Sequence, residues 1–461
     1  MVFNNLMDTE MKNIILYITI LFCLSACELT EVLDQDPPNN LEPNNVLTDQ
    51  ASAENLLNGS YSFLNSRDFY LNTEGHPGLL SGSMAIRTFG ESTFEANDIL
   101  VDGNGARAYW TAFYQFINAA NIVITLVDRM PDGAIDAERK KEIIAEAHFL
   151  RAFGHFNALV YYGQFYDTTS ELGIIIRSEI ANFQNRSKSR SSVEECYLFI
   201  LDDLDVAIAD APDFFETIRA SKTAAKALKA RVLLFKGDYA EAAALANEVI
   251  QDGTRNLAAT FQDVFDAGYD SEEMIFMAYA DENTLSTGRT RTKTLVYGGR
   301  RLIASDYLQD TLASDPRATT TFNATNGAIL KVYDTDNFSP TYFIRLAEMY
   351  LIAAEGLTRS GATLESSKEP LEALRSRAFG SPQVSTASSS NELLDEIYNE
   401  IIAELVFENG SEWFAGIRFD KITEVKPTVT SSDKYILPIP LREIESNFAI
   451  DFEDQNPGYT Q

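Results

Sequence analysis

Several long stretches of the chain place apolar residues three or four positions apart, the spacing of helices that bury one face. The clearest lie at 110–127 and 143–160, and others are expected near 204–211, 227–250, 346–357 and 394–405. The 143–160 stretch carries two adjoining apolar lines, so we expect that helix to be buried on two sides. The lines are Trp110, Tyr114, Ile117, Asn121, Ile124 and Val127; Phe149, Phe153, Phe156 and Val160; and Ile143, Ala147, Leu150 and Ala158.

Residues 227–250 contain two apolar stripes separated by Gly237, Asp238 and Tyr239. Helix, Gly-x-Tyr-x-x-Ala, helix is the spacing of a tetratricopeptide unit, in which small alanines let two helices approach closely. Looser pairs follow the same plan at 145–211 and 341–380. Three or more such pairs would stack on a shared core, so we expect a scaffold of helical pairs.

The remaining stretches, 66–106, 164–190, 252–340 and 409–461, are rich in glycine, polar residues and aromatics. They are too long to be simple connections between packed helices, and long loops on a rigid scaffold usually carry function. Short strands are expected at 274–277 and 435–437. The predicted fold is mainly α, with a tetratricopeptide-like scaffold, loop-rich insertions and a few strands in one domain over 49–461.

The N-terminal region carries an apolar run, 14–24, after Lys12 and before Leu24-Ser25-Ala26-Cys27. The run is too short for a transmembrane helix and is typical of a secretory signal. Its end resembles the bacterial lipobox, where the signal is cut before a cysteine that then carries lipid. We predict an over-long start at 1–10, a signal at 11–26 and a lipid-anchored tether at 27–48, with Cys27 as the anchor.

A signal peptide with a chance cysteine is the alternative at this end. No later apolar stretch is expected to cross a membrane, so the predicted protein is anchored to a membrane without spanning it. Cys23 would leave with the signal and Cys27 would carry the lipid. That leaves Cys196 as a packed thiol.

Motifs for cofactors and catalysis are weak. No Gly-x-Ser-x-Gly, Walker loop or His-Glu-x-x-His occurs, and neighbouring carboxylates are unavoidable in a chain with 68 acidic residues. Residues 334–337 resemble the start of a calcium loop, but the glycine and closing glutamate are missing, and Arg345 stands in the latter's place. We expect no cofactor, with adventitious calcium as an open alternative, and no enzymatic activity.

The 461 residues include 37 basic and 68 acidic side chains, a net charge of −31. Such a field repels phosphate backbones, so we exclude nucleic acid as a partner. The same acidity is expected to disfavour large polyanionic ligands.

Six segments in the same order resemble the SusD/RagB family of glycan-binding lipoproteins of Bacteroidetes. They are WTAFYQFINAAN (110–121), AEAHFLRAF (145–153), YLFILDDL (197–204), YFIRLAEMYLIAAE (342–355), YILPIP (435–440) and QNPGY (455–459). Residues 399–413 depart from the family pattern, since its leading arginine is missing and the turn near Gly410 differs. That departure puts in doubt any ion pair the family makes there.

The resemblance implies a non-enzymatic lipoprotein on the outer surface of the outer membrane. It would capture oligosaccharides with its loop half and deliver them to a SusC-like TonB-dependent transporter, which the tetratricopeptide half would face. Three alternatives stay open: a tetratricopeptide-type scaffold that binds only protein, a surface glycosidase, and capture of another nutrient such as a peptide. The sequence does not name the glycan.

Sugar rings offer an apolar face to aromatic side chains and hydroxyl groups to polar ones. Loop residues of both kinds are therefore candidates for ligand binding, against the alternative that loop aromatics only pin their loops to the core. The candidates are Arg87, Phe89, Asn97, Asp98, Tyr279, Tyr297, Arg300 and Trp413.

Overall fold

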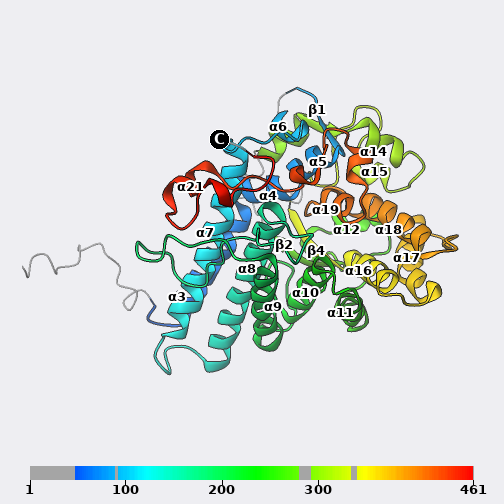
Figure 1. Ribbon diagram of the computed structural model, residues 1–461. Coiled ribbons are helices and arrows are strands. Elements are labelled where there is room, and N and C mark those ends of the chain that lie inside the picture. The colour runs from blue at the N-terminus through cyan, green and yellow to red at the C-terminus, as the bar shows by residue number, and fades with distance from the viewer. Residues whose placement is uncertain (1–46, 89–91, 280–291, 334–339, 460–461) are drawn as a thin grey trace, which may run out of the picture. The chain divides into compact units, whose positions relative to one another are not determined.

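The computed structural model describes residues 47–88, 92–279, 292–333 and 340–459 (Figure 1). The chain divides into two units, Met1–Thr48 and Asp49–Gln461, and the second is described below. The predicted signal, Cys27, Phe89 and the calcium-like run at 334–337 lie outside the described residues.

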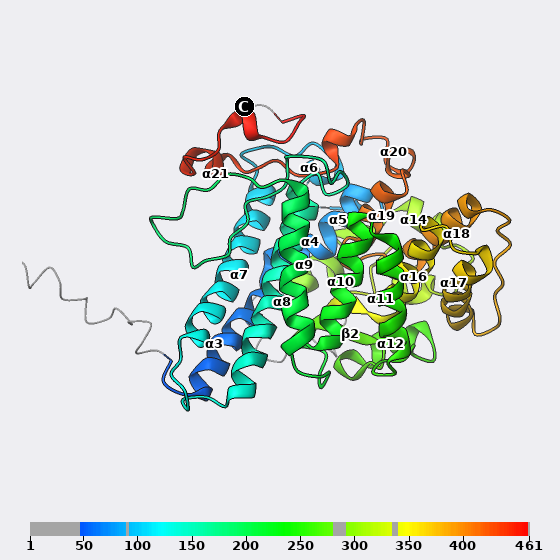
Figure 2. The same ribbon diagram turned by 60° about the horizontal axis from the view of Figure 1, so that its bottom comes forward.

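Four long helices form the first part of the scaffold: α3 (Gln50–Ser62), α7 (Asn104–Asp128), α8 (Ala137–Tyr162) and α9 (Val193–Asp210). Figures 1 and 2 show α7, α8 and α9 side by side, and the three pack closely in sequence order. Every residue of α8 from Phe149 to Tyr162 is buried, which confirms the predicted two-sided burial. The thiol of Cys196 is buried in α9, as expected.

By length and composition alone, helix α7 could cross a membrane, although we predicted no such stretch after the signal. Half of its apolar window is buried inside the structure. It packs against α8, α3 and α4 (Arg67–Thr73). Its apolar face therefore belongs to the core, because Phe113, Phe116 and Ile117 have no exposed surface.

The predicted helical pairs are α8–α9, α10 (Lys222–Lys236) with α11 (Tyr239–Gln251), and α16 (Leu346–Arg359) with α17 (Leu364–Phe379). They stack, because α9 packs on α10 and α11 packs on α16. Gly237 ends α10 in the left-handed region, φ 96°, which suits glycine. Helix α18 (Ser390–Leu405) covers α16 and α17, so the mainly α prediction is confirmed.

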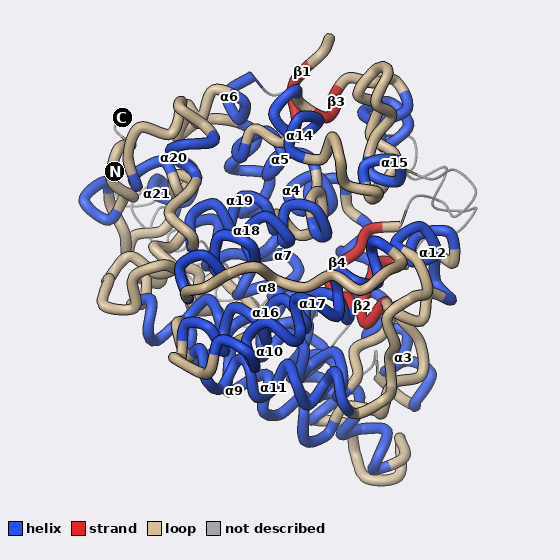
Figure 3. The backbone as a smooth tube through the Cα atoms, turned by 90° about the vertical axis from the view of Figure 1, so that its right-hand side faces the viewer, coloured by secondary structure: helices blue, strands red, loops and turns tan. Residues whose placement is uncertain are grey.

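Two small antiparallel sheets lie in the loop-rich half (Figure 3). Strand β1 (Met84–Ile86) pairs with β3 (Leu302–Ala304), and β2 (Met274–Ala278) pairs with β4 (Thr341–Arg345) across a bulge. The strand expected at 274–277 is β2. The one expected at 435–437 is wrong: these residues follow a 3₁₀ turn, and the Leu437 amide donates to the last turn of α8 at Tyr161.

Short helices complete the loop-rich half, where α19 packs against α5 and α18. They are α5 (Gly75–Ser81), α6 (Ser92–Glu95), α12 (Phe261–Asp266), α14 (Asp306–Thr311), α15 (Ala318–Thr321), α19 (Ser411–Arg418), α20 (Ile422–Val425) and α21 (Leu441–Ser446), with the single turns η2 (Phe63–Asn65), η3 (Gly268–Asp270), η4 (Thr294–Gly298), η5 (Ser432–Lys434) and η6 (Phe452–Asp454).

Candidate functional site

Two of the predicted sugar platforms, Tyr297 and Trp413, are core residues. Each is only 1% exposed, and the Tyr297 hydroxyl donates to the buried carboxylate of Glu74 at 3.3 Å. A sugar needs an open ring face, and neither ring offers one. The prediction for these two residues is wrong, because burying a large aromatic side chain in the core is more favourable than leaving it in water.

Asn97 is also structural, because it is 3% exposed and adopts a left-handed conformation, φ 52°. Its amide nitrogen donates to the Leu80 carbonyl, and its side-chain oxygen accepts from the Thr428 hydroxyl. The neighbouring Asp98 is exposed and lies 3.9 Å from the ammonium of Lys434. Asn97 therefore holds a turn, and only Asp98 of this pair faces solvent.

Arg87 directly follows β1 and Arg300 lies two positions before β3, so both are near the same end of the β1–β3 sheet. The Arg87 amide donates to the Arg301 carbonyl at 2.8 Å, which extends the strand pairing by one residue. Arg87 is exposed and Arg300 is half-buried. This end gathers cations, while its predicted aromatic partner, Phe89, lies outside the described residues.

Tyr279 is the predicted residue with an open ring, 45% exposed, directly after β2. It lines two adjoining hollows of about 230 and 440 Å³. Phe214 links the larger of them to a third hollow of about 590 Å³. These three hollows, which we name the Tyr279 groove, share lining residues and follow the 213–219 segment between α9 and α10.

Aromatic rings and polar groups alternate along the Tyr279 groove. The rings of Tyr269 and Tyr279 lie 6.0 Å apart, and Phe215 is 57% exposed. Guanidinium groups lie over two further rings, at 4.5 Å for Arg255 on Phe214 and 4.6 Å for Arg219 on Tyr61. The polar groups along the three hollows are those of Asn58, Asn65, Glu216, Asp270, Lys222, Lys226, Asp252 and Thr254.

Backbone contacts fasten the groove to the scaffold. The Met277 amide of β2 donates to the Thr217 carbonyl at 2.9 Å, and the Thr217 hydroxyl donates to the Tyr269 carbonyl. The Ala220 amide donates to the Tyr61 hydroxyl of α3. Burial raises the pKa of Tyr61, which keeps that hydroxyl protonated, so it also donates to Glu146 at 2.7 Å. The groove is therefore preformed on rigid elements.

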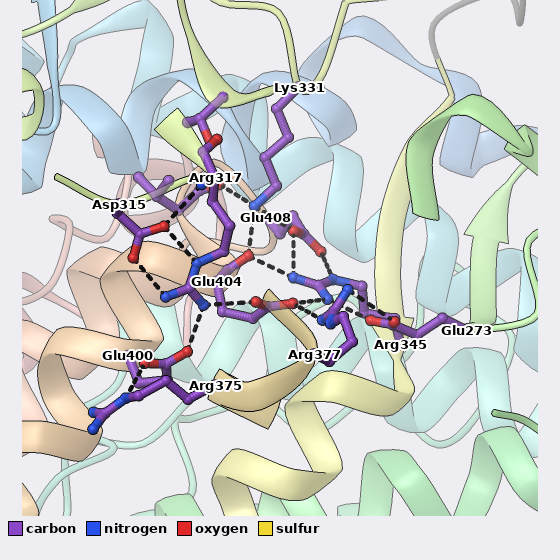
Figure 4. A network of polar contacts seen from close by, with 12 residues as sticks. Glu273, Asp315, Arg317, Lys331, Arg345, Arg375, Arg377, Glu400, Glu404 and Glu408 are labelled. Carbon is purple, nitrogen blue, oxygen red and sulfur yellow. Dashed lines mark hydrogen bonds and ion pairs between the residues drawn. The ribbon is translucent and has the colours of Figure 1, made fainter. Parts of the chain in front are cut away.

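A buried ion network holds the two strands that lead into the groove (Figure 4). Arg345, at the end of β4, contacts Glu273, just before β2, at 2.6 Å. The same guanidinium contacts Glu404 of α18 and Glu408 beyond it, both at 2.7 Å. Arg317, Lys331, Arg375, Arg377, Asp315 and Glu400 complete the network.

The network answers the doubt raised by the unusual 399–413 segment, whose Glu400, Glu404 and Glu408 all make ion pairs. Burial disfavours ionisation of Glu404, but Arg377, Arg345 and Arg317 outweigh it and lower its pKa. Burial lowers the pKa of Lys331 to about 8, although Glu408 opposes that shift. The strands β2 and β4 thus pair with each other through their backbones and are held to α18 by ion pairs.

Sequence reasoning missed Phe214, Phe215, Tyr269 and Arg255. The signal was the run Asp213-Phe-Phe-Glu216 after Pro212, in a short connection between two helices. Two adjacent aromatics in so polar a turn point in different directions, so both are rarely buried. Among the described residues, no group of three or more histidine, cysteine or acidic side chains is placed to hold a metal ion.

Sequence comparisons match two profiles to separate parts of the chain. Residues 31–234 match a family described as "Starch-binding associating with outer membrane", and residues 314–425 match the SusD family. The SusD-like protein P2 of Formosa agariphila is 27% identical over 515 residues, covering 96% of this chain and 99% of that protein.

Structural comparisons agree in fold. A SusD superfamily protein of Bacteroides vulgatus has a TM-score of 0.75 at 21% identity, covering 90% of this chain and all of the other. A laminarin-binding SusD-like protein has a TM-score of 0.73 at 22% identity, covering 89% and 100%. With two profiles, a full-length relative and the shared fold in agreement, the chain belongs to the SusD/RagB family.

Proposed function

We propose that the protein binds oligosaccharides without cleaving them, and that the Tyr279 groove is the binding site. The observation that carries this proposal is that two exposed rings, Tyr279 and Phe215, lie beside hydrogen-bonding side chains in the same hollow. The starch-binding description of the matched family and the laminarin-binding neighbour support a glycan as the ligand.

The chemistry of the groove suits a linear chain of neutral sugars. Tyr279 and Phe215 would stack against the C–H faces of sugar rings, while amide, carboxylate and ammonium groups would bond hydroxyls. Three adjoining hollows would hold successive sugar units. Because the rings are already fixed by the scaffold, binding would cost little ordering of the protein.

We also propose a cellular location and a transport partner. The protein would sit on the outer membrane through lipid at Cys27 and pass its cargo to a SusC-like TonB-dependent transporter. The association with the outer membrane in the family description supports the location. Capture by stacking and hydrogen bonding needs no metal, so the proposal predicts that a chelator leaves glycan affinity unchanged.

A glycan array with product formation measured in parallel tests the proposal. For the glycan that binds, Tyr279→Ala and Phe215→Ala should each weaken affinity about tenfold, since an aromatic contact contributes on the order of 1 kcal/mol beyond its buried area. Tyr297→Phe is the matched control: it alters a buried tyrosine and should leave affinity unchanged.

The alternatives predict different results. Loss of binding in Arg87→Ala with full binding in Tyr279→Ala would move the site to the end of the β1–β3 sheet. Product formation would contradict non-catalytic capture. Binding to the transporter with no glycan bound in any format would favour a protein-binding scaffold.

A further inference from the structure

A separate hollow of about 410 Å³ lies between α7, the connection from α8 to α9, and α21. Figures 1 and 2 show this connection beside α21. The Asn447 side chain joins the two segments, because it accepts from the Lys188 amide and donates to the Lys188 carbonyl. Trp110, Tyr114 and Asn118 line it from successive turns of α7. It shares no residue with the Tyr279 groove, and its volume is that of a small-ligand site.

The floor of this hollow is apolar and already hydrogen-bonded. The rings of Trp110 and Tyr114 lie 4.6 Å apart, and the Tyr114 hydroxyl donates to the Ile175 carbonyl. Glu443 of α21 accepts from the Trp110 indole at 3.2 Å and from the Asn447 amide at 3.0 Å. The single carboxylate of the lining is therefore engaged by neutral donors.

The later part of the connection, 174–192, is basic in an acidic protein, with four cations against the one carboxylate of Glu179. In the described part of the chain, none of the four makes an ion pair. The four are Arg177, Arg186, Lys188 and Arg190. Arg177 instead donates to the backbone carbonyls of Asn185 and Arg186. Cations elsewhere on the surface, such as Lys229 and Lys421, contact carboxylates.

Two phenylalanines hold Arg186 at the edge of the hollow. Its guanidinium lies 4.2 Å from the centre of the Phe183 ring and 5.4 Å from that of Phe448. These rings are 77% and 79% exposed. Stacking orients a planar group whose N–H donors suit a carboxylate or sulfate, and it leaves the positive charge without an anionic partner.

We propose that this hollow binds an anionic sugar unit, with its carboxylate or sulfate at Arg186 and its ring against the half-buried Tyr114 and the exposed Phe448. The inference rests on the proposed function only in taking a sugar as the ligand. At this hollow, acidic glycans would bind despite the negative net charge of the protein. Screening over about 8 Å at physiological salt lets the local cations dominate the field there.

Titration with tetrasaccharides of galacturonate, alginate and carrageenan tests this inference, each against its methyl-esterified or desulfated form. We expect at least one carboxylated or sulfated probe to bind about tenfold more tightly than its neutral form, and more weakly as salt rises. Comparing the carboxylated with the sulfated probes identifies the preferred anion. Arg186→Gln and Phe448→Ala should each cost about tenfold in affinity for the bound probe.

Controls separate this site from the groove. Arg129→Gln removes an exposed cation at the far end of α7 and should change nothing. Tyr279→Ala should leave anionic binding intact while weakening neutral-glycan binding, so either site can fail without the other.

Three outcomes would overturn the inference. The first is that no anionic probe binds more tightly than its neutralised form, or that none binds at all. Another is unchanged affinity in Arg186→Gln. The third is binding of phosphatidylglycerol vesicles that depends on Phe183 and Phe448 with no anionic sugar bound, which would make the patch a membrane contact.

Discussion

Glu412 is a carboxyl group buried in α19 with 1% exposure. One oxygen accepts from the Phe407 amide, and the other has no hydrogen-bond partner among the described residues. Burial raises its pKa to about 8, so at pH 7 it is largely protonated. Because the folded pKa is above the ordinary 4.5, its contribution to stability is present below pH 4.5 and is lost as pH rises through 8.

Glu412→Gln should therefore stabilise the protein at high pH and make little difference near pH 4. The gain should grow by on the order of 1.4 kcal/mol per pH unit between these limits. Urea unfolding at pH 5, 7 and 9 measures it, with the exposed Glu445→Gln as control. Parallel pH profiles for Glu412→Gln and the parent protein would contradict the assignment.

Between elements, the buried ion network joins β2 and β4 to α18 through Glu404, which contacts Arg345, Arg317 and Arg377. Glu404→Gln leaves three guanidinium groups short of charge, and breaking a buried pair costs about 3–5 kcal/mol. We expect a loss of that order in urea unfolding at pH 7.

Glu396→Gln is the control for the network, because its partially exposed pair with Arg375 should contribute no more than about 1 kcal/mol. If Glu404→Gln and Glu396→Gln unfolded at the same urea concentration, the buried network would not contribute the stability expected of it. Acid should remove the Glu404 contribution as well, since a lowered pKa makes it disappear as pH falls below the ordinary range of a carboxyl group.

The scaffold depends on the close approach of α11 and α16 at Gly356. A Cβ there would lie 2.6 Å from the Tyr239 carbonyl oxygen and 3.0 Å from the Ala243 Cβ, and backbone cannot easily move away. Gly356→Ala should destabilise by about 1–3 kcal/mol through overpacking. Gly59→Ala, in an exposed turn of α3 with nothing within 4 Å, should stabilise by roughly 0.5–1 kcal/mol.

Thermal unfolding of the Gly356→Ala and Gly59→Ala variants tests this packing. Equal shifts of the same sign would contradict it.

At the scale of the whole molecule, the proposed lipid anchor would tether a strongly acidic protein to a membrane. Cys27→Ala should release the protein from the membrane fraction and abolish labelling with radioactive palmitate. Cys23→Ala, four positions earlier in the predicted signal, should leave both unchanged. Retention of labelled Cys27→Ala in the membrane fraction would contradict the anchor.

The fold could largely be read from periodicity, since α7, α8, α10, α11, α16 and α18 all lie where apolar residues recur at helical spacing. The candidate site could be read only in part. Tyr279 and Tyr297 are both loop aromatics in the sequence, yet one is 45% exposed and the other 1%. That difference depends on Glu74, 223 positions from Tyr297, and no local pattern contains it.

The sequence alone therefore predicts the helix positions, the family and the lipobox. Each depends on short runs of residues that are close together in the chain. Tertiary structure decided which aromatic rings are open and that Phe214 and Phe215 line a groove. It also decided that Arg186 contacts two phenylalanine rings and makes no ion pair among the described residues. Those features depend on contacts between distant segments, where packing and charge compensation are settled only once the chain has folded.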